Sequence, residues 1–283
     1  MSNKVIRLIP RIDVKGPNLV KGIHLEGLRV LGKPEEFALH YYKNSADELM
    51  FMDIVASLYE RNSLHEIISK TAREIFIPIT VGGGIRSLED IREVLRAGAD
   101  KVSLNTAAIR NPNFIKKAAL EFGTSTISIS IESIKHGDNN YYAYTDNGRE
   151  YSGREVIEWA KKVEALGAGE LNICSVDREG TRSGFDIELF KKINKNVSIP
   201  LIATGGAGNL EDFSDLIDEA KVDAISFSSI IHYNYIKKNK TGSASKAEGN
   251  IEFIKNKNNS EIFKTFSILE IKDYLNSKGI KCR

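Results

Sequence analysis

The chain has 283 residues, of which 41% are hydrophobic, and its 40 basic and 38 acidic residues leave a formal net charge of +2. This length fits either one α/β barrel or two smaller domains, and the balanced charge singles out no nucleic-acid or membrane partner. Cys174 and Cys282 are too far apart for a disulfide framework or a zinc site, and no apolar run reaches the roughly 18 residues of a membrane span, so we expect a cytoplasmic protein without metal or cofactor.

Short apolar runs alternate with amphipathic helical stretches along the chain. The predicted strands are Val5–Ile12, Glu48–Met52, Pro78–Val81, Lys101–Leu104, Ser125–Ile131, Glu170–Ser175, Pro200–Ala203 and Asp223–Phe227. The predicted helices are Pro34–Lys43, Leu64–Glu74, Leu88–Ala97, Asn113–Glu121, Arg154–Leu166, Ile187–Lys195, Leu210–Glu219 and Ile268–Ser277. Strict alternation predicts a parallel sheet closed into a (β/α)8 TIM barrel, with an open doubly wound sheet as the alternative.

An internal repeat favours the barrel. The segment TVGGGIRSLED at 80–90 recurs as ATGGAGNLED at 203–212, and ADKVSLNTAAI at 99–109 recurs as KVDAISFSSII at 221–231. Two (βα)4 halves close naturally into eight strands, so we expect one barrel domain spanning 1–283. Two stretches lie outside the repeat in this interpretation: a hairpin at 136–153, turned at Asp146-Asn147-Gly148, and a mobile surface insertion at 237–257.

Two glycine clusters, 82–84 and 205–208, follow the third and seventh predicted strands. Either cluster alone could be only a tight turn. Each, however, is followed one βα unit later by hydroxyl or amide side chains at a strand end, Asn105 and Thr106 in one half and Ser228 and Ser229 in the other. Paired loops of this kind suit phosphate binding. The repeat therefore predicts two phosphate cups, which we call the first and second cup, and a ligand with a phosphate at each end.

Carboxylates end four of the predicted strands. Asp13 and Glu132 end the first and the fifth, which places them opposite each other at the barrel mouth, where they could act as general acid and base. Lys21 is expected beside Asp13. Asp53 and Asp177 end the second and sixth strands, and either could instead be an ordinary helix or turn cap. Asp13 could likewise only cap a turn, and Glu132 could pair with Lys135.

The chain carries, in this order, the motifs RIDVKGPNLVKG, DELMFMDI, PITVGGGI, GADKVSLNTAA, GAGELNICSVDREGTRSGFD and IATGGAG. Together they resemble the cyclase subunit of imidazole glycerol phosphate synthase, from Arg7 to His232 and in the last helix. The resemblance implies a lyase and cyclase that uses ammonia from a glutaminase partner. Its bisphosphorylated ribulosyl-aminoimidazole substrate would give imidazole glycerol phosphate and an aminoimidazole carboxamide ribonucleotide. Asp13 and Glu132 would be catalytic, and the phosphates would bind at Gly84, Asn105, Thr106, Gly180, Gly206, Ser228 and Ser229.

Four charged residues fall at the starts of predicted strands, at the opposite end of the barrel: Arg7, Glu48, Lys101 and Glu170. They could be solvated charges on loop ends. Inward charges must be paired, however, and two of each sign can pair around a ring. The resemblance implies that this ring closes the entrance through which ammonia enters the barrel, on the face where the glutaminase docks.

The chain departs from the family pattern at Glu132 and Glu179, where the family has the shorter aspartate. The loop after the first strand and the 237–257 insertion are more similar to paralogues in surface-polysaccharide gene clusters. The alternative hypothesis is therefore a protein that passes ammonia to a sugar amidotransferase in lipopolysaccharide biosynthesis, with weak or no cyclase activity. A third hypothesis is the phosphorylated-sugar isomerase of histidine biosynthesis, which has a similar half-barrel repeat, but the charged ring would have no purpose there.

Overall fold

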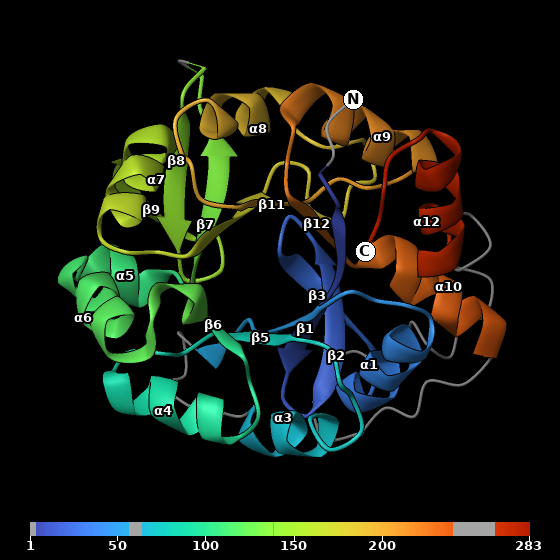
Figure 1. The fold of residues 1–283 in the computed structure, drawn as a ribbon, viewed down its shortest axis with the longest axis horizontal. Helices are drawn as coiled ribbons and strands as arrows, with labels where there is room; N and C mark the ends of the chain where they lie inside the picture. Colours follow the sequence, from blue (N-terminus) through green and yellow to red (C-terminus); the bar gives the residue numbers. More distant parts are fainter. Residues whose placement is uncertain (1–3, 57–63, 138, 240–263) are drawn as a thin grey trace.

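The structure is a computed structural model that describes residues 4–56, 64–137, 139–239 and 264–283. Within these residues a closed barrel of parallel strands is surrounded by helices (Figure 1). The barrel strands are, in order around the barrel, β1 (Arg7–Lys15), β4 (Leu49–Asp53), β5 (Ile79–Gly82), β6 (Lys101–Leu104), β7 (Ile127–Lys135), β10 (Glu170–Ser175), β11 (Leu201–Thr204) and β12 (Ala224–Phe227). Parallel pairing of β7 with β10 and of β12 with β1 closes the circle. The predicted (β/α)8 barrel is confirmed.

The helices lie outside the strands (Figure 1). They are α1 (Pro34–Lys43), α3 (His65–Thr71), α4 (Leu88–Arg96), α5 (Thr106–Arg110), α6 (Asn113–Phe122), α7 (Val156–Ala165), α8 (Ile187–Asn194), α9 (Leu210–Ala220), α10 (Ser229–Asn239) and α12 (Ile268–Ser277), with a 3₁₀ turn at Thr124–Thr126. Short α5 and longer α10 were not predicted. The first three residues of the expected 237–257 insertion belong to α10, and the remainder lies outside the described residues. No helix of the described residues is long and apolar enough to cross a membrane.

Each half of the barrel carries an antiparallel hairpin on its first strand. In the second half, β8 (Tyr141–Thr145) pairs with β7 and with β9 (Glu150–Glu155), and the hairpin turns at 146–148. In the first half, β2 (Asn18–Ile23) pairs with β1 and with β3 (Glu26–Gly32). The hairpin predicted within 136–153 is present, and the first half has a corresponding hairpin in a different sequence, which sequence analysis did not predict.

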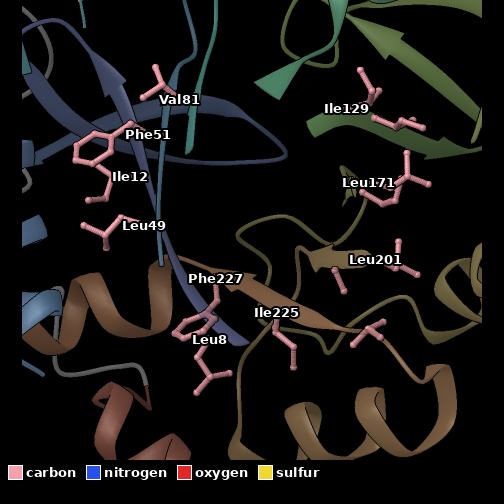
Figure 2. Close-up of a cluster of buried hydrophobic side chains, with 14 of the residues drawn as sticks. Leu8, Ile12, Leu49, Phe51, Val81, Ile129, Leu171, Leu201, Ile225 and Phe227 are labelled. Atoms are coloured by element: carbon pink, nitrogen blue, oxygen red, sulfur yellow. The ribbon is translucent and has the colours of Figure 1, made fainter. Parts of the chain in front are cut away.

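Inward and outward side chains of the strands form two hydrophobic clusters. Outward residues such as Leu8, Phe51 and Ile225 are fully buried between the barrel and the helices (Figure 2). Burial of one such side chain stabilises the fold by about 1.5–3 kcal/mol. A smaller cluster contains inward residues of the barrel, among them Ile9, Met50, Ile202 and Ala224. The period-2 alternation of the strands thus separates the structural core from the barrel interior.

Two aspartates of the sequence repeat hold the repeated loops in place. Asp90 Oδ2 accepts the backbone N–H groups of Arg86 and Ser87 at 2.8 and 2.9 Å, before helix α4. Asp212 Oδ2 accepts those of Gly208 and Asn209, both at 2.8 Å, before α9. A capping carboxylate satisfies donors that a helix start leaves free. The Leu-Glu-Asp motif of both halves therefore fixes the two glycine loops against the helices that follow.

Candidate active site

The first cup opens into a cavity of about 280 Å³ at the carboxyl ends of β4 to β7. Gly84, Asn105 and Thr106 line this cavity, as predicted cup residues, and so do Asp53 and Glu132. The Thr106 hydroxyl accepts the backbone N–H of Asp146 at 3.2 Å, so its own proton remains available for a ligand. The predicted phosphate-binding residues of the first cup and one of the two predicted catalytic carboxylates therefore share one cavity.

The glycines of the first cup are required by the backbone. Gly83 has a φ of +99°, and a Cβ at this position would lie 2.2 Å from the carbonyl oxygen of Asp53. Gly84 has a φ of +72°. Only glycine adopts such conformations at little cost, and only glycine lets two loops approach this closely. The loop after β5 thus packs directly on the end of β4 and presents its backbone to the cavity.

The second cup brings together Gly180, Gly206, Ser228 and Ser229 around a narrow space of about 10 Å³. Gly206 has a φ of +113°, and a Cβ there would lie 2.1 Å from the carbonyl oxygen of Gly184. Helix α10 starts at Ser229, so its free N–H groups face this space. A wider cavity of about 350 Å³ adjoins the cup through Gly180 and Ser229 and is also lined by Lys21.

Asp13 is buried among cationic side chains. The Arg11 Nε–H donates to Asp13 Oδ1 at 2.7 Å, and Lys21 Nζ lies 3.5 Å from Asp13 Oδ2. Burial alone would raise the pKa of Asp13, but the two cations outweigh burial and lower this pKa below its usual value. The carboxyl group of Asp13 therefore stays ionised at neutral pH.

Glu132 has the opposite electrostatic setting. Its side chain is 7% exposed, and its Oε2 accepts the backbone N–H of Gly148 at 2.8 Å, at the turn of the β8–β9 hairpin. Burial raises the pKa of Glu132 to about 7, although the Gly148 N–H and the Arg11 charge act in the other direction. Glu132 can therefore both donate and accept a proton near neutral pH. The proposed pairing with Lys135 is absent, since Lys135 Nζ contacts Glu188 at 3.1 Å.

Asp13 and Glu132 project from opposite sides of the barrel. Asp13 is on β1 and Glu132 on β7, which are separated by β4, β5 and β6 on one side and by β10, β11 and β12 on the other. Arg11 extends between them, because it binds Asp13 and also lines the cavity that contains Glu132. Sequence reasoning missed Arg11. Its position two residues before Asp13 on a strand, which places both side chains on one face, was the available signal.

Lys21 and Glu179 form a buried ion pair on the other side of Asp13. Both side chains are nearly inaccessible, and Glu179 raises the pKa of Lys21 against the lowering effect of burial. Sequence analysis singled out Glu179 only as a departure from the family pattern, not as a site residue. The hairpin β2–β3 delivers Lys21 to the site, and the loop after β10 delivers Glu179.

Asp53 and Asp177 have different surroundings. Asp53 lines the first cavity, and its Oδ1 also accepts the backbone N–H of Val55 at 3.1 Å, as an Asx turn does. Asp177 is exposed, and its Oδ2 accepts the backbone N–H of Lys135 at 2.8 Å. It lines neither cup. The structure thus places Asp177 at the outer rim as a loop cap, which was the alternative considered for it.

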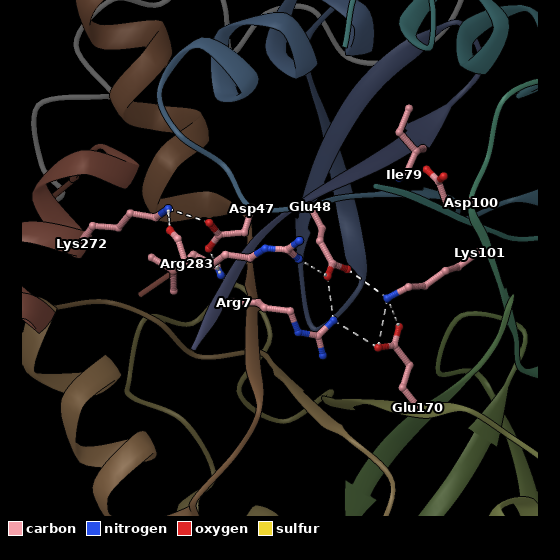
Figure 3. Close-up of polar contacts among 10 residues, drawn as sticks. Arg7, Asp47, Glu48, Ile79, Asp100, Lys101, Glu170, Lys272 and Arg283 are labelled. Atoms are coloured by element: carbon pink, nitrogen blue, oxygen red, sulfur yellow. Dashed lines mark hydrogen bonds and ion pairs between the residues drawn. The ribbon is translucent and has the colours of Figure 1, made fainter. Parts of the chain in front are cut away.

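At the other end of the barrel, four charged side chains form a closed ring, which we call the charged ring (Figure 3). Arg7 contacts Glu48 at 2.8 Å and Glu170 at 3.3 Å, and Lys101 contacts the same two carboxylates at 3.1 and 3.2 Å. Burial would raise the pKa of Glu48, but Arg7 and Lys101 lower it. Glu48 therefore stays ionised at neutral pH, and the four ion pairs span the bottom of the barrel.

The C-terminal segment lies beside the charged ring. The Arg283 guanidinium is 3.9 Å from Glu48, and the Arg283 carbonyl oxygen accepts a hydrogen bond from Lys272 at 2.6 Å (Figure 3). Lys272 also pairs with Asp47 at 2.7 Å. Sequence analysis did not anticipate this, because nothing in a terminal Arg reveals which strand end it meets. Among the described residues, no cluster of His, Cys, Asp and Glu has the arrangement of a metal site.

Comparison with known proteins gives consistent matches over most of the chain. The family described as "Histidine biosynthesis protein" matches residues 7–237. The "Imidazole glycerol phosphate synthase subunit HisF" of Legionella pneumophila is 55% identical over 214 residues, which are 76% of this chain and 100% of that protein. Proteins of the same name from Alkaliphilus metalliredigens and Lactococcus lactis subsp. lactis are 44% and 43% identical over 81% and 91% of this chain, and over 91% and 97% of their own lengths.

Proposed function

The chain belongs to the histidine biosynthesis protein family, and on this premise we propose that it is the ammonia-dependent cyclase subunit of an imidazole glycerol phosphate synthase. The substrate is then a bisphosphorylated ribulosyl-aminoimidazole intermediate. The products are imidazole glycerol phosphate and an aminoimidazole carboxamide ribonucleotide. A glutaminase subunit supplies the ammonia.

One observation carries the proposal: two carboxylates with opposite pKa shifts stand between two glycine-lined cups. A cup on each side of the mouth suits a substrate with a phosphate at each end. Two titratable groups whose pKa values are pushed apart suit a reaction that needs both a proton donor and a proton acceptor. The site thus matches both ends and the reacting middle of the proposed substrate.

Asp13 and Glu132 have different roles in this proposal. Asp13 remains a carboxylate, so it stabilises positive charge that develops on the nitrogen derived from ammonia and accepts a proton from it. Glu132, with a pKa of about 7, donates protons to and accepts protons from the substrate atoms at the bond that is cleaved and at the ring that closes. Arg11 and Lys21 keep Asp13 ionised. Gly84, Asn105 and Thr106 hold one phosphate, and Gly180, Gly206, Ser228 and Ser229 hold the other.

The glutaminase is proposed to dock on the face that carries the charged ring. Ammonia released there reaches the carboxylates through the barrel interior, which avoids loss to solvent. Arg7, Glu48, Lys101 and Glu170 close this entrance with four ion pairs. A ring of paired charges can open when a partner competes for one of its members, whereas an apolar plug offers a partner no such contact.

The direct test is turnover of the bisphosphorylated intermediate by the isolated protein with ammonium chloride as the nitrogen source. Formation of both products is expected, with the rate rising with pH as ammonium loses its proton. Absence of both products at saturating ammonium would refute the cyclase assignment. The alternative, an ammonia conduit for a sugar amidotransferase, is not favoured, since the relatives reported above are named as synthase subunits.

A further inference from the structure

Inside the barrel, the side chains of Asn172 and Met50 meet across the axis. Asn172 is on β10 and Met50 on β4, and these strands are separated by β11, β12 and β1 on one side and by β5, β6 and β7 on the other. The Asn172 Nδ2–H points at Met50 Sδ, 3.4 Å away, and both side chains are fully buried. A contact between opposite strands narrows the barrel interior at its level.

This contact lies directly above the charged ring. Asn172 follows Glu170 by two residues on β10, and Met50 follows Glu48 by two residues on the chain that enters β4. Residues two apart on a strand share a face and are separated by roughly 6–7 Å along it. Ser130, the register partner of Asn172, comes two residues before Glu132 on β7. The Asn172–Met50 contact therefore lies between the ring and the carboxylates.

The Asn172 amide is only half satisfied by its protein partners. Its Oδ1 accepts a hydrogen bond from the Thr204 hydroxyl at 2.8 Å, which fixes the orientation of the amide. Its Nδ2 has only long contacts, to Ser130 Oγ at 3.5 Å and to the thioether of Met50, which is a weak acceptor. A buried amide N–H that lacks a good acceptor is costly. The Asn172 Nδ2–H can therefore donate a hydrogen bond to a small ligand that offers a lone pair.

Further polar atoms in the barrel strands lack partners. The hydroxyl groups of Ser103, Ser128 and Ser226 are buried and have no hydrogen-bond partner among the described residues. Ser128 is paired in register with Glu170 of the ring and with Ser103. Barrel interiors are usually filled by branched apolar side chains, which need no partners. The hydroxyl oxygens of these serines can accept hydrogen bonds from the N–H groups of a small ligand, both below and above Asn172 along the barrel axis.

We propose that Asn172 is a relay point for neutral ammonia and that Asn172 and Met50 together form a second constriction above the charged ring. This inference rests on the proposed function. The lone pair of ammonia accepts the Asn172 Nδ2–H in place of the Met50 sulfur, and the ammonia N–H groups donate to Ser128 or Ser130. Asn172 and Met50 carry no charge. An ammonium ion that passed them would lose its hydrating water without gaining an ion pair, which costs much free energy, whereas neutral ammonia has no such cost and passes.

The test uses the complex of the full chain with its glutaminase, supplied with glutamine and the bisphosphorylated intermediate. Asn172→Leu keeps the approximate volume and removes the amide. We expect the imidazole product formed per glutamate released to fall at least fivefold, while turnover of the variant with bulk ammonium chloride stays within twofold of the unmodified protein. Bulk ammonia reaches the open mouth directly and does not need the relay.

Two further variants complete the test. Ile202→Val changes an inward apolar residue in register with Asn172 and should leave the product-to-glutamate ratio unchanged. Thr204→Val releases the amide oxygen and should lower the ratio two- to threefold, and it decides the question if Asn172→Leu does not fold. Unchanged ratios in both polar variants, with normal ammonium-dependent turnover, would overturn this inference alone. No ammonium-dependent turnover in the unmodified protein would instead overturn the proposed function.

Discussion

Asp13 and Glu132 stand on opposite strands of one barrel, and their surroundings shift their pKa values in opposite directions. Two cations adjacent to Asp13 lower its pKa, whereas burial raises that of Glu132 to about 7. Arg11 touches Asp13 and reaches the cavity of Glu132, so one guanidinium serves both. A carboxylate side chain in the corresponding place of each half-barrel thus has two different electrostatic settings, which is how a repeat can supply both an acid and a base.

The raised pKa of Glu132 predicts a stability effect that needs no substrate. The folded protein binds this proton more tightly than the unfolded chain, whose glutamate has a pKa near 4.5. The contribution to stability is therefore complete below about pH 4.5 and is lost as the pH rises through about 7. Glu132→Gln removes this titration, so the variant should gain about 2.5 kcal/mol relative to the unmodified protein between pH 5 and pH 8.

Chemical denaturation of both proteins at pH 5 and at pH 8 measures this effect. Asp177→Asn is the matched control, because Asp177 is an exposed carboxylate at the same end of the barrel. Its stability relative to the unmodified protein should not change between the two pH values. A Glu132→Gln difference that is equal at pH 5 and pH 8 would show that Glu132 does not change its protonation state between these two pH values, and it would contradict a pKa near 7.

Activity should respond to the length of the side chain at position 132. Glu132→Asp withdraws the carboxylate from the Gly148 N–H by about one carbon–carbon bond, and misplacement on this scale lowers turnover by roughly ten- to a hundredfold. Asp13→Asn should cost at least as much, and it should also destabilise the fold by about 3–5 kcal/mol, since Arg11 and Lys21 lose a shared partner.

Steady-state turnover with ammonium chloride is the readout for both variants. Asp177→Asn again serves as the control and should stay within twofold of the unmodified protein. Full activity of Glu132→Asp would mean that the longer side chain is not adapted to this site. Improved activity would indicate that the native chain is a poor cyclase, in agreement with the conduit hypothesis.

The barrel could be predicted from the sequence because its signals are local and repeated. Strands and helices alternate, and the Leu-Glu-Asp capping motif occurs in both halves. The hairpin after β7 was predicted from its Asp-Asn-Gly turn. The corresponding β2–β3 hairpin of the first half was not predicted, although the two-fold repeat suggests that one hairpin should have a counterpart. The hairpin before α1 lacks such a turn and bends instead at His24 and Leu25, which have φ angles of +52° and +63°.

The site was less predictable than the fold because its properties depend on contacts distant in sequence. Glu132 owes its raised pKa to burial, which outweighs the opposing effect of the Gly148 N–H, and the sequence reveals neither of these two contributions. Glu179 and Lys21 are 158 residues apart, and they meet only when the loop after β10 packs on the β2–β3 hairpin. Arg11 was the exception. Its position two residues before Asp13 on a strand places both side chains on one face, which the sequence alone indicates.

The two cups should bind anions in the absence of substrate. Crystals grown from millimolar sulfate should contain one anion near Gly84 and Thr106 and a second near Gly206 and Ser229. Gly206→Ala should remove the second anion, because the added Cβ would lie 2.1 Å from the Gly184 carbonyl oxygen in a backbone conformation that alanine disfavours. It should also raise the concentration of sulfate needed for thermal stabilisation at least tenfold.

Gly153→Ala separates backbone strain from loss of the cup. Gly153 has a φ of +72°, but an added Cβ meets nothing within 4 Å. This variant should lower thermal stability slightly and leave sulfate binding intact. Two empty cups in the unmodified protein at millimolar sulfate would contradict the assignment of the loops to phosphate binding.

The charged ring predicts a difference between the two nitrogen sources. Lys101→Glu puts a third carboxylate beside Glu48 and Glu170, which now lie about 3 Å from the Lys101 ammonium. Like charges at this distance repel, so the side chains must separate and the ring cannot close as it does in Figure 3. Glutamine-dependent turnover in the glutaminase complex should fall at least tenfold. Ammonium-dependent turnover of the isolated protein should stay within threefold, because the mouth lies at the opposite end of the barrel.

Lys161→Glu makes the same charge reversal on the exposed helix α7, and it should change neither rate. An equal loss with both nitrogen sources would show that the ring only stabilises the barrel, since a purely structural defect cannot distinguish where the ammonia comes from.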